Sequence, residues 1–198
     1  YAFAYSLDLT SIEIPEGVKN IGEGAFAWCE SLTSIKIPEG VTDIFDRTFE
    51  NCSSLTSVEL PDSVTSIGNY AFKDCSNLVS LEMPKDVTSI GESAFSGCSS
   101  LTSMKIPEGI TMIGSETFKD CINLGSVEIP DSVTDFGDSA FANCSSLTTV
   151  ILPENVTRVG SYQFNDCKKL NKIIYKGIKI PTGYNMFSNT ASDLTAYV

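Results

Sequence analysis

Hydrophobic and polar positions follow one pattern from end to end of the chain, and a single segment, 55–77, illustrates it. Val58 and Leu60 alternate with the polar Ser57 and Glu59, which predicts a short strand with one buried and one exposed face. A second apolar pair follows a proline at the strand end, and a glycine then supplies a bend. Ala71, Phe72 and Cys75 come next at a spacing that predicts one short helical turn facing the core.

The pattern recurs every 23 residues, in four residue types at once. Leu recurs at 9, 32, 55, 78, 101, 124, 147 and 170; Cys at 29, 52, 75, 98, 121, 144 and 167; Pro at 15, 38, 61, 84, 107, 130 and 153; and Phe at 3, 26, 49, 72, 95, 118, 141, 164 and 187. A single unit cannot bury its apolar face, whereas stacked units can. The period therefore predicts a solenoid with a parallel β-sheet, short second strands or turns, and one helical turn per repeat.

The repeat also defines the expected domain organisation, which is one solenoid over residues 1–198. We expect a truncated first repeat at 1–8, seven complete repeats at 9–169 and a degenerate capping repeat at 170–198. The last unit has Lys176 where proline is expected and Met186-Phe187 in place of Ala-Phe. Because the chain opens in the middle of a repeat, we expect further chain upstream. We therefore draw no conclusion about targeting from this terminus.

The opening Leu-x-x-Ile-x-Ile, followed by IPEGVTxIGxxAFxxCSS, resembles the BspA-like class of leucine-rich repeats over about residues 2–192. The resemblance implies an α/β leucine-rich repeat fold in the form of a curved, right-handed solenoid. It also implies a setting in cell-surface or secreted proteins of bacteria or protozoa, with adhesion or protein binding as the usual role. An extracellular or cell-surface location is therefore expected.

Charge and composition argue against nucleic-acid binding, membrane-spanning helices and chemistry that depends on histidine. Residues 1–154 contain 7 Lys/Arg and 23 Asp/Glu, which gives a formal net charge of −16. Residues 155–198 contain 6 Lys/Arg and 2 Asp/Glu, which gives a formal net charge of +4. The acidic body argues against nucleic-acid binding. No apolar run approaches the roughly 20 residues of a membrane-spanning helix. The chain contains no His, which removes the commonest general base and metal ligand.

No motif of an enzyme or cofactor site stands out from the repeat. There is no P-loop, no nucleophile elbow and no metal-binding signature, and nearly every residue has copies one repeat away. We expect a non-enzymatic, monomeric module without cofactors, whose partner is a protein, such as a host matrix or cell-surface protein, or a glycan. A structural spacer and a noncatalytic arm of a larger multidomain protein are the alternatives.

The seven cysteines occupy the same place in each unit, beside the core phenylalanine. Parallel side chains would hold neighbouring Cβ atoms about as far apart as the strands, beyond the ~3.8 Å typical of a disulfide. We expect a ladder of buried, unreactive thiols, with a disulfide or a metal array as the alternatives.

The acidic residues after each proline are expected to form solvated turns, since Lys85 interrupts the column. Three N-glycosylation triplets begin at Asn51, Asn143 and Asn155 and matter only in a eukaryotic secretory setting.

Candidate partner-binding residues lie where the period fails. On the predicted outer face of the strands, a column of Glu and Lys ends in Ile151 and Ile174, beside Lys172. The alternative is that the C-terminal cap folds over them. Near the other end, Tyr5 and Trp28 stand in a column of polar residues and glycine that we expect to face solvent, and Phe45 replaces a recurrent glycine. The alternative for these aromatic residues is contact with upstream chain or ordinary exposure.

Overall fold

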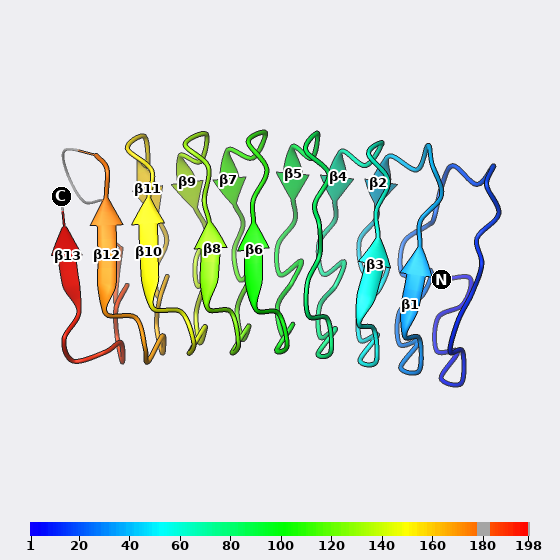
Figure 1. Cartoon of the computed structure of the whole chain (residues 1–198), viewed down its shortest axis with the longest axis horizontal. Coiled ribbons are helices and arrows are strands. Elements are labelled where there is room, and N and C mark those ends of the chain that lie inside the picture. Colours follow the sequence, from blue (N-terminus) through cyan, green and yellow to red (C-terminus); the bar gives the residue numbers. More distant parts are fainter. Residues whose placement is uncertain (178–182, 198) are drawn as a thin grey trace.

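The computed structural model describes residues 1–177 and 183–197 and confirms a solenoid of parallel strands with about seven turns. Figure 1 shows the coils following one another along the long axis, with a front row and a back row of strands. We number the seven complete repeats 1 to 7 from Leu9, so that each begins at one of the recurrent leucines.

The front row contains strands that the alternating pattern predicts, together with one further strand at the C-terminal end that it does not predict. They are β1 (Ser34–Lys36), β3 (Ser57–Glu59), β6 (Ser103–Lys105), β8 (Ser126–Glu128), β10 (Thr149–Leu152), β12 (Lys172–Tyr175) and β13 (Thr195–Tyr197). Every pairing is parallel and offset by one repeat, so that Ile35 lies beside Val58 and Val150 beside Ile173. Alternate residues point inward and outward, which places inward hydrophobic residues such as Ile35, Val58 and Ile173 in the core.

The back row contains the second, shorter strands. They are β2 (Asp43–Ile44), β4 (Ser66–Ile67), β5 (Ser89–Ile90), β7 (Met112–Ile113), β9 (Asp135–Phe136) and β11 (Arg158–Val159). Each pairs in parallel with the equivalent residues of a neighbouring repeat, as Ile67 does with Ile90. The inner residue of every pair is buried, so the second apolar pair of the repeat closes the core from behind.

The prediction of a short helical turn in each repeat was wrong for the backbone conformation, although the inward-facing residues of this segment are buried as expected. Within the described residues this segment forms a series of tight turns, in which Tyr70 and Asp74 adopt a left-handed φ of 58°. An α-helix requires φ near −60° at every residue, so these positions interrupt it. The N–H groups of Tyr70, Phe72 and Asp74 instead donate to carbonyls of the next repeat at 2.8–2.9 Å. Bonding between coils replaces bonding within a helix.

The core is built of ladders in which each residue packs on its own copy. The phenylalanine rings stack from Phe3 to Phe187 with centroids 5.3–5.8 Å apart and nearly parallel planes. From Phe49 to Phe164 the rings of this ladder are fully buried. Stacking of identical rings adds to the burial of apolar surface, because offset parallel aromatic pairs attract one another.

Candidate binding surfaces

The outer face of the front row is polar over most of its length. Its central column contains Glu13, Lys36, Glu59, Glu82, Lys105 and Glu128, all exposed. The ion pairs along this face are loose and solvated: Lys105 Nζ lies 3.8 Å from Glu128, with both side chains more than 70% exposed. Pairs of this kind contribute little to stability. This part of the face is a charged surface without a formed site.

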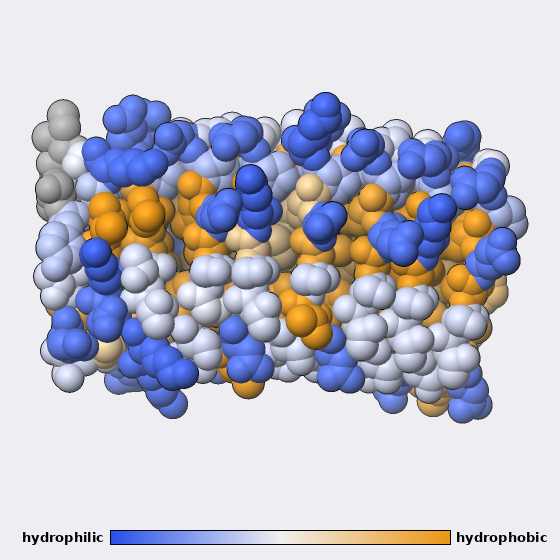
Figure 2. Space-filling view, in the orientation of Figure 1, coloured by the Kyte–Doolittle hydropathy of each residue, from blue (hydrophilic) through white to orange (hydrophobic). Residues whose placement is uncertain are grey.

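At the C-terminal end the same column becomes apolar. The pairing of β10, β12 and β13 places Ile151, Ile174 and Tyr197 side by side on three adjacent strands. Ile151 is 45% exposed, Tyr197 is 52% exposed, and Ile174 lies half-buried between them. Figure 2 shows hydrophobic surface over β10 and β12 at this end of the face, within an interrupted band of hydrophobic surface that runs along the solenoid. The structure therefore brings two of the predicted residues into contact range and adds Tyr197, which sequence reasoning missed.

Lys172, the third residue predicted at this end, lies two positions before Ile174 on β12 and is exposed. Its Nζ is 5.2 Å from the centre of the Tyr197 ring, within range of a cation–π interaction. The described part of the C-terminal unit extends the sheet sideways through β13. Tyr197 was overlooked because the period alone does not show that the last residues form another strand of the same sheet.

The aromatic residues at the other end are only partly brought together. Tyr5 and Trp28 stack at 5.9 Å between centroids, with their planes 10° apart. Tyr5 is 67% exposed and Trp28 is 37% exposed. Phe45 is 41% exposed, and no ring contact joins it to either residue in the part of the chain that the structure describes.

Backbone conformation explains why the column of Tyr5 and Trp28 is otherwise made of Asn, Asp and Gly. All of its described members have a left-handed φ, as follows: Tyr5 62°, Trp28 63°, Asn51 58°, Asp74 58°, Gly97 76°, Asp120 61°, Asn143 59°, Asp166 59° and Asn189 57°. Glycine, asparagine and aspartate adopt this conformation most readily. We expected the column's composition to reflect solvent exposure, but the requirement for positive φ accounts for it more directly.

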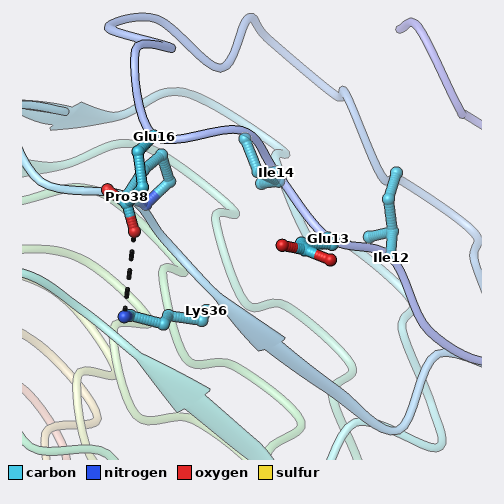
Figure 3. A pocket seen from close by; sticks show the side chains of 6 residues that line it. All are labelled: Ile12, Glu13, Ile14, Glu16, Lys36 and Pro38. Atoms are coloured by element: carbon cyan, nitrogen blue, oxygen red, sulfur yellow. Dashed lines mark ion pairs between the residues drawn. The ribbon is translucent and has the colours of Figure 1, made fainter.

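A shallow pocket lies between repeats 1 and 2, at the junction of the strand face with the acidic turns. Figure 3 shows Glu16 and Lys36 on its rim, joined by an ion pair of 3.9 Å, with Ile12 and Ile14 along one side. Its lining mixes one cation with two carboxylates, Glu13 and Glu16. Nothing in this arrangement provides a nucleophile paired with a base.

A larger groove, of about 710 Å³, lies between repeats 4 and 5, where the front row is interrupted. Among the described residues, Ser80–Met83 form no strand and no backbone hydrogen bond to either neighbouring repeat. Leu81, Met83 and Ile106 line the groove, with Lys85 and Lys105 at its edge. The change from a carboxylate to Lys85 in the acidic column was the one sequence signal near this site.

The seven thiols are buried and free, as the ladder interpretation predicts. Each Sγ also donates to the carbonyl of the phenylalanine 26 residues earlier, at 3.1–3.2 Å, as in Cys75 to Phe49. Burial raises the pKa of Cys52 and of Cys167 to about 12, and raises the pKa of Cys75, Cys98, Cys121 and Cys144 well above the ordinary value. Neutral thiols are poor nucleophiles and poor metal ligands.

Metal-ligand and membrane features are absent from the described ranges. Residues 1–177 and 183–197 contain no group of three or more His, Cys, Asp or Glu side chains arranged to hold a metal ion. Over the same ranges, no helix has the length and apolar character needed to cross a bilayer. No cofactor-binding arrangement is evident on the surfaces described above.

The stacked parallel strands, the recurrent leucines and the polar outer face define a leucine-rich repeat solenoid. The family model for the BspA type leucine rich repeat region matches residues 1–107 and 88–195, with six copies. The chain belongs to this family.

Solved structures of similar proteins agree with the family. A leucine-rich repeat protein from Bacteroides ovatus is 33% identical with a TM-score of 0.76, and the match covers 98% of this chain and 56% of that one. The leucine-rich repeat protein of T. pallidum is 32% identical with a TM-score of 0.69, over 75% of this chain and 69% of that one. The pneumococcal vaccine antigen PcpA shares the fold at 22% identity and a TM-score of 0.54, over 91% of this chain and 54% of that one. The chain thus spans little more than half the length of the Bacteroides protein. A comparison with the curated proteins finds no match.

Proposed function

We propose that this chain is a non-enzymatic protein-binding module of a cell-surface or secreted protein, and that it binds its partner through the outer face of the sheet at β10, β12 and β13. Leucine-rich repeat proteins are generally non-catalytic and usually bind proteins. The surface and adhesive setting is the one that membership of the BspA-type family suggests.

One observation carries the proposal: the central column of the outer face changes from charged to apolar at Ile151, Ile174 and Tyr197. The strand pairs β1–β3 and β6–β8 show that parallel pairing does not need apolar residues there, because Lys36, Glu59, Lys105 and Glu128 occupy the same column in those strands. Adjacent exposed apolar side chains on an otherwise polar face are typical of interaction sites.

Immobilised chain should bind at least one member of a panel of extracellular-matrix proteins and glycans saturably, as measured by biolayer interferometry. The double variant Ile151→Asp/Ile174→Asp should lose this binding by at least tenfold. The matched control is Lys36→Asp/Glu59→Asp, which changes the same outward column on the adjacent strands β1 and β3. Thermal unfolding of both variants would verify that each remains folded.

Equal binding by the two double variants would place the binding surface elsewhere. Absence of binding to the whole panel would favour a structural spacer or a noncatalytic arm of a larger protein, for which a regular polar face is sufficient.

A further inference from the structure

The chemistry of β12 on its outer face is more specific than an apolar patch. Lys172, Ile174 and Lys176 alternate with the buried Ile173 and Tyr175, so an isoleucine stands between two outward lysines. Successive outward residues of a strand are about 6.5–7 Å apart, which keeps both ammonium groups within reach of a ligand seated on Ile174.

Across the strands, the apolar line of Ile151, Ile174 and Tyr197 runs along the solenoid axis, at right angles to β12. Three strands at about 4.8 Å spacing give it a length of roughly 10 Å between the outer Cα atoms. Lysines border this line on both sides, with Lys172 held near the Tyr197 ring and Lys176 paired with Asp131 at 2.9 Å. Aliphatic and aromatic side chains bordered by cations suit a partner with an apolar stripe bordered by carboxylates.

The charge distribution of the whole chain supports the same partner. Lys168 and Lys169 are exposed just before β12, and residues 155–198 carry a balance of +4. Residues 1–154 carry −16. An acidic partner is therefore repelled by the body of the solenoid and attracted to its C-terminal end, which favours one docking position over the others.

We propose that the outer face of β10, β12 and β13 docks an acidic amphipathic segment of a partner protein. The segment's apolar stripe lies over Ile151, Ile174 and Tyr197, and its carboxylates face Lys172 and Lys176. This inference rests on the proposed function, since it names the chemistry of the partner that the same surface binds. A strongly hydrated anionic polysaccharide would satisfy the lysines and leave the apolar line uncovered, so a protein segment fits better.

Two fluorescent peptides of about 20 residues test the proposal by fluorescence polarisation. Both carry the same leucine stripe on a designed amphipathic helix, and the stripe is bordered by Glu in one and by Lys in the other. Folded wild-type chain should bind the Glu peptide at least tenfold more tightly than the Lys peptide, and added salt should reduce the difference. Heparin, tested in parallel, should bind more weakly than the Glu peptide.

The double variant Lys172→Glu/Lys176→Glu should bind the Glu peptide at least tenfold more weakly than the wild type. The matched control is Lys36→Glu/Lys105→Glu, which reverses two exposed lysines on the polar part of the same face and should change binding by less than twofold. Lys172→Glu alone leaves the Lys176–Asp131 pair intact, and should show an intermediate loss if the double variant proves unstable.

Equal affinity for the two peptides, no binding of either, tighter binding of heparin, or an equal loss in the control variant would overturn the proposal. These outcomes differ from failure of the proposed function. Binding of a panel protein that is abolished by Ile151→Asp/Ile174→Asp but insensitive to Lys172→Glu/Lys176→Glu would retain the module and reject an acidic partner.

Discussion

The central repeats and the C-terminal repeats of this solenoid have the same interior but different outer faces. Phe95 and Phe164 are both fully buried in the same ring ladder, and Cys98 and Cys167 donate to equivalent carbonyls. The outward column nevertheless changes from charged residues to Ile151 and Ile174. Stacking constrains the inward positions because each contacts its own copy, whereas outward positions are free to diverge and to acquire a function.

The strongest test of this contrast is alkaline pH, because it acts on the buried thiols that the central and C-terminal repeats share. Burial raises the folded-state pKa of the thiols above their ordinary value of 9.0. Above about pH 9 the unfolded chain releases thiol protons that the folded chain retains, so the free energy of unfolding falls as pH rises toward 12. Each such thiol contributes a slope of about 1.4 kcal/mol per pH unit.

Chemical denaturation under reducing conditions from pH 8 to 10.5 should show this loss. In Cys75→Ala/Cys98→Ala the slope should be shallower by about 1.4 kcal/mol per pH unit for each thiol removed. A slope that is unchanged in the double variant would mean that other groups dominate the alkaline transition.

Removal of a ring from the middle of the ladder should be more costly than removal from its end. Phe95 stacks on both neighbours and is fully buried, whereas Phe187 is the last ring of the ladder among the described residues and is only partly buried. Phe95→Ala should reduce the free energy of unfolding by about 3–5 kcal/mol, and Phe187→Ala by clearly less, in urea denaturation. Equal losses would contradict nearest-neighbour stacking.

Close approach between coils should make one glycine essential and its counterpart replaceable. A Cβ added to Gly160 would lie 2.4 Å from the backbone of Gly137 in the preceding repeat, whereas a Cβ added to Gly114 would meet Thr117 Oγ1 and the backbone of Glu92 at 3.4–3.6 Å, which is ordinary van der Waals contact. Neither position needs a positive φ, so space alone distinguishes them. Gly160→Ala should cost about 2 kcal/mol or more, as overpacking does. Gly114→Ala should be neutral or stabilising by up to about 1 kcal/mol, and thermal unfolding would separate the two.

The smallest expected effect is an increase in the free energy of unfolding. Gln163 is fully buried, and neither its amide nitrogen nor its amide oxygen has a hydrogen-bond partner in the described residues. Thr117, in the same column of the central repeats, is equally buried but donates to the carbonyl of Gly114 at 2.9 Å. Gln163→Met should stabilise the chain by about 1–2 kcal/mol, whereas Thr117→Val should destabilise it by about 1 kcal/mol. Destabilisation by Gln163→Met would indicate that the amide has a partner.

The amino-acid sequence by itself determined the solenoid, its period and its interior. Apolar residues at fixed offsets can be buried only if the repeats stack in register, so the alternation around Val58, the ring ladder and the buried thiols all follow from the 23-residue period. Ile151, Ile174 and Lys172 could be singled out in the same way, because a departure from a column is visible without coordinates.

Only the tertiary structure decided how the backbone between the strands is bonded and which residues complete the surface. The tight turns at Tyr70 and Asp74 replace the predicted helix because their N–H groups bond to the next coil, an interaction between residues 22 positions apart that local spacing does not reveal. Tyr197 joins the apolar line because β13 pairs with β12, although the sequence that leads to it has lost the repeat pattern. Local periodicity determines which side chains are buried. Contacts between coils determine the backbone conformation between the strands and the residues that complete the apolar line on the outer face.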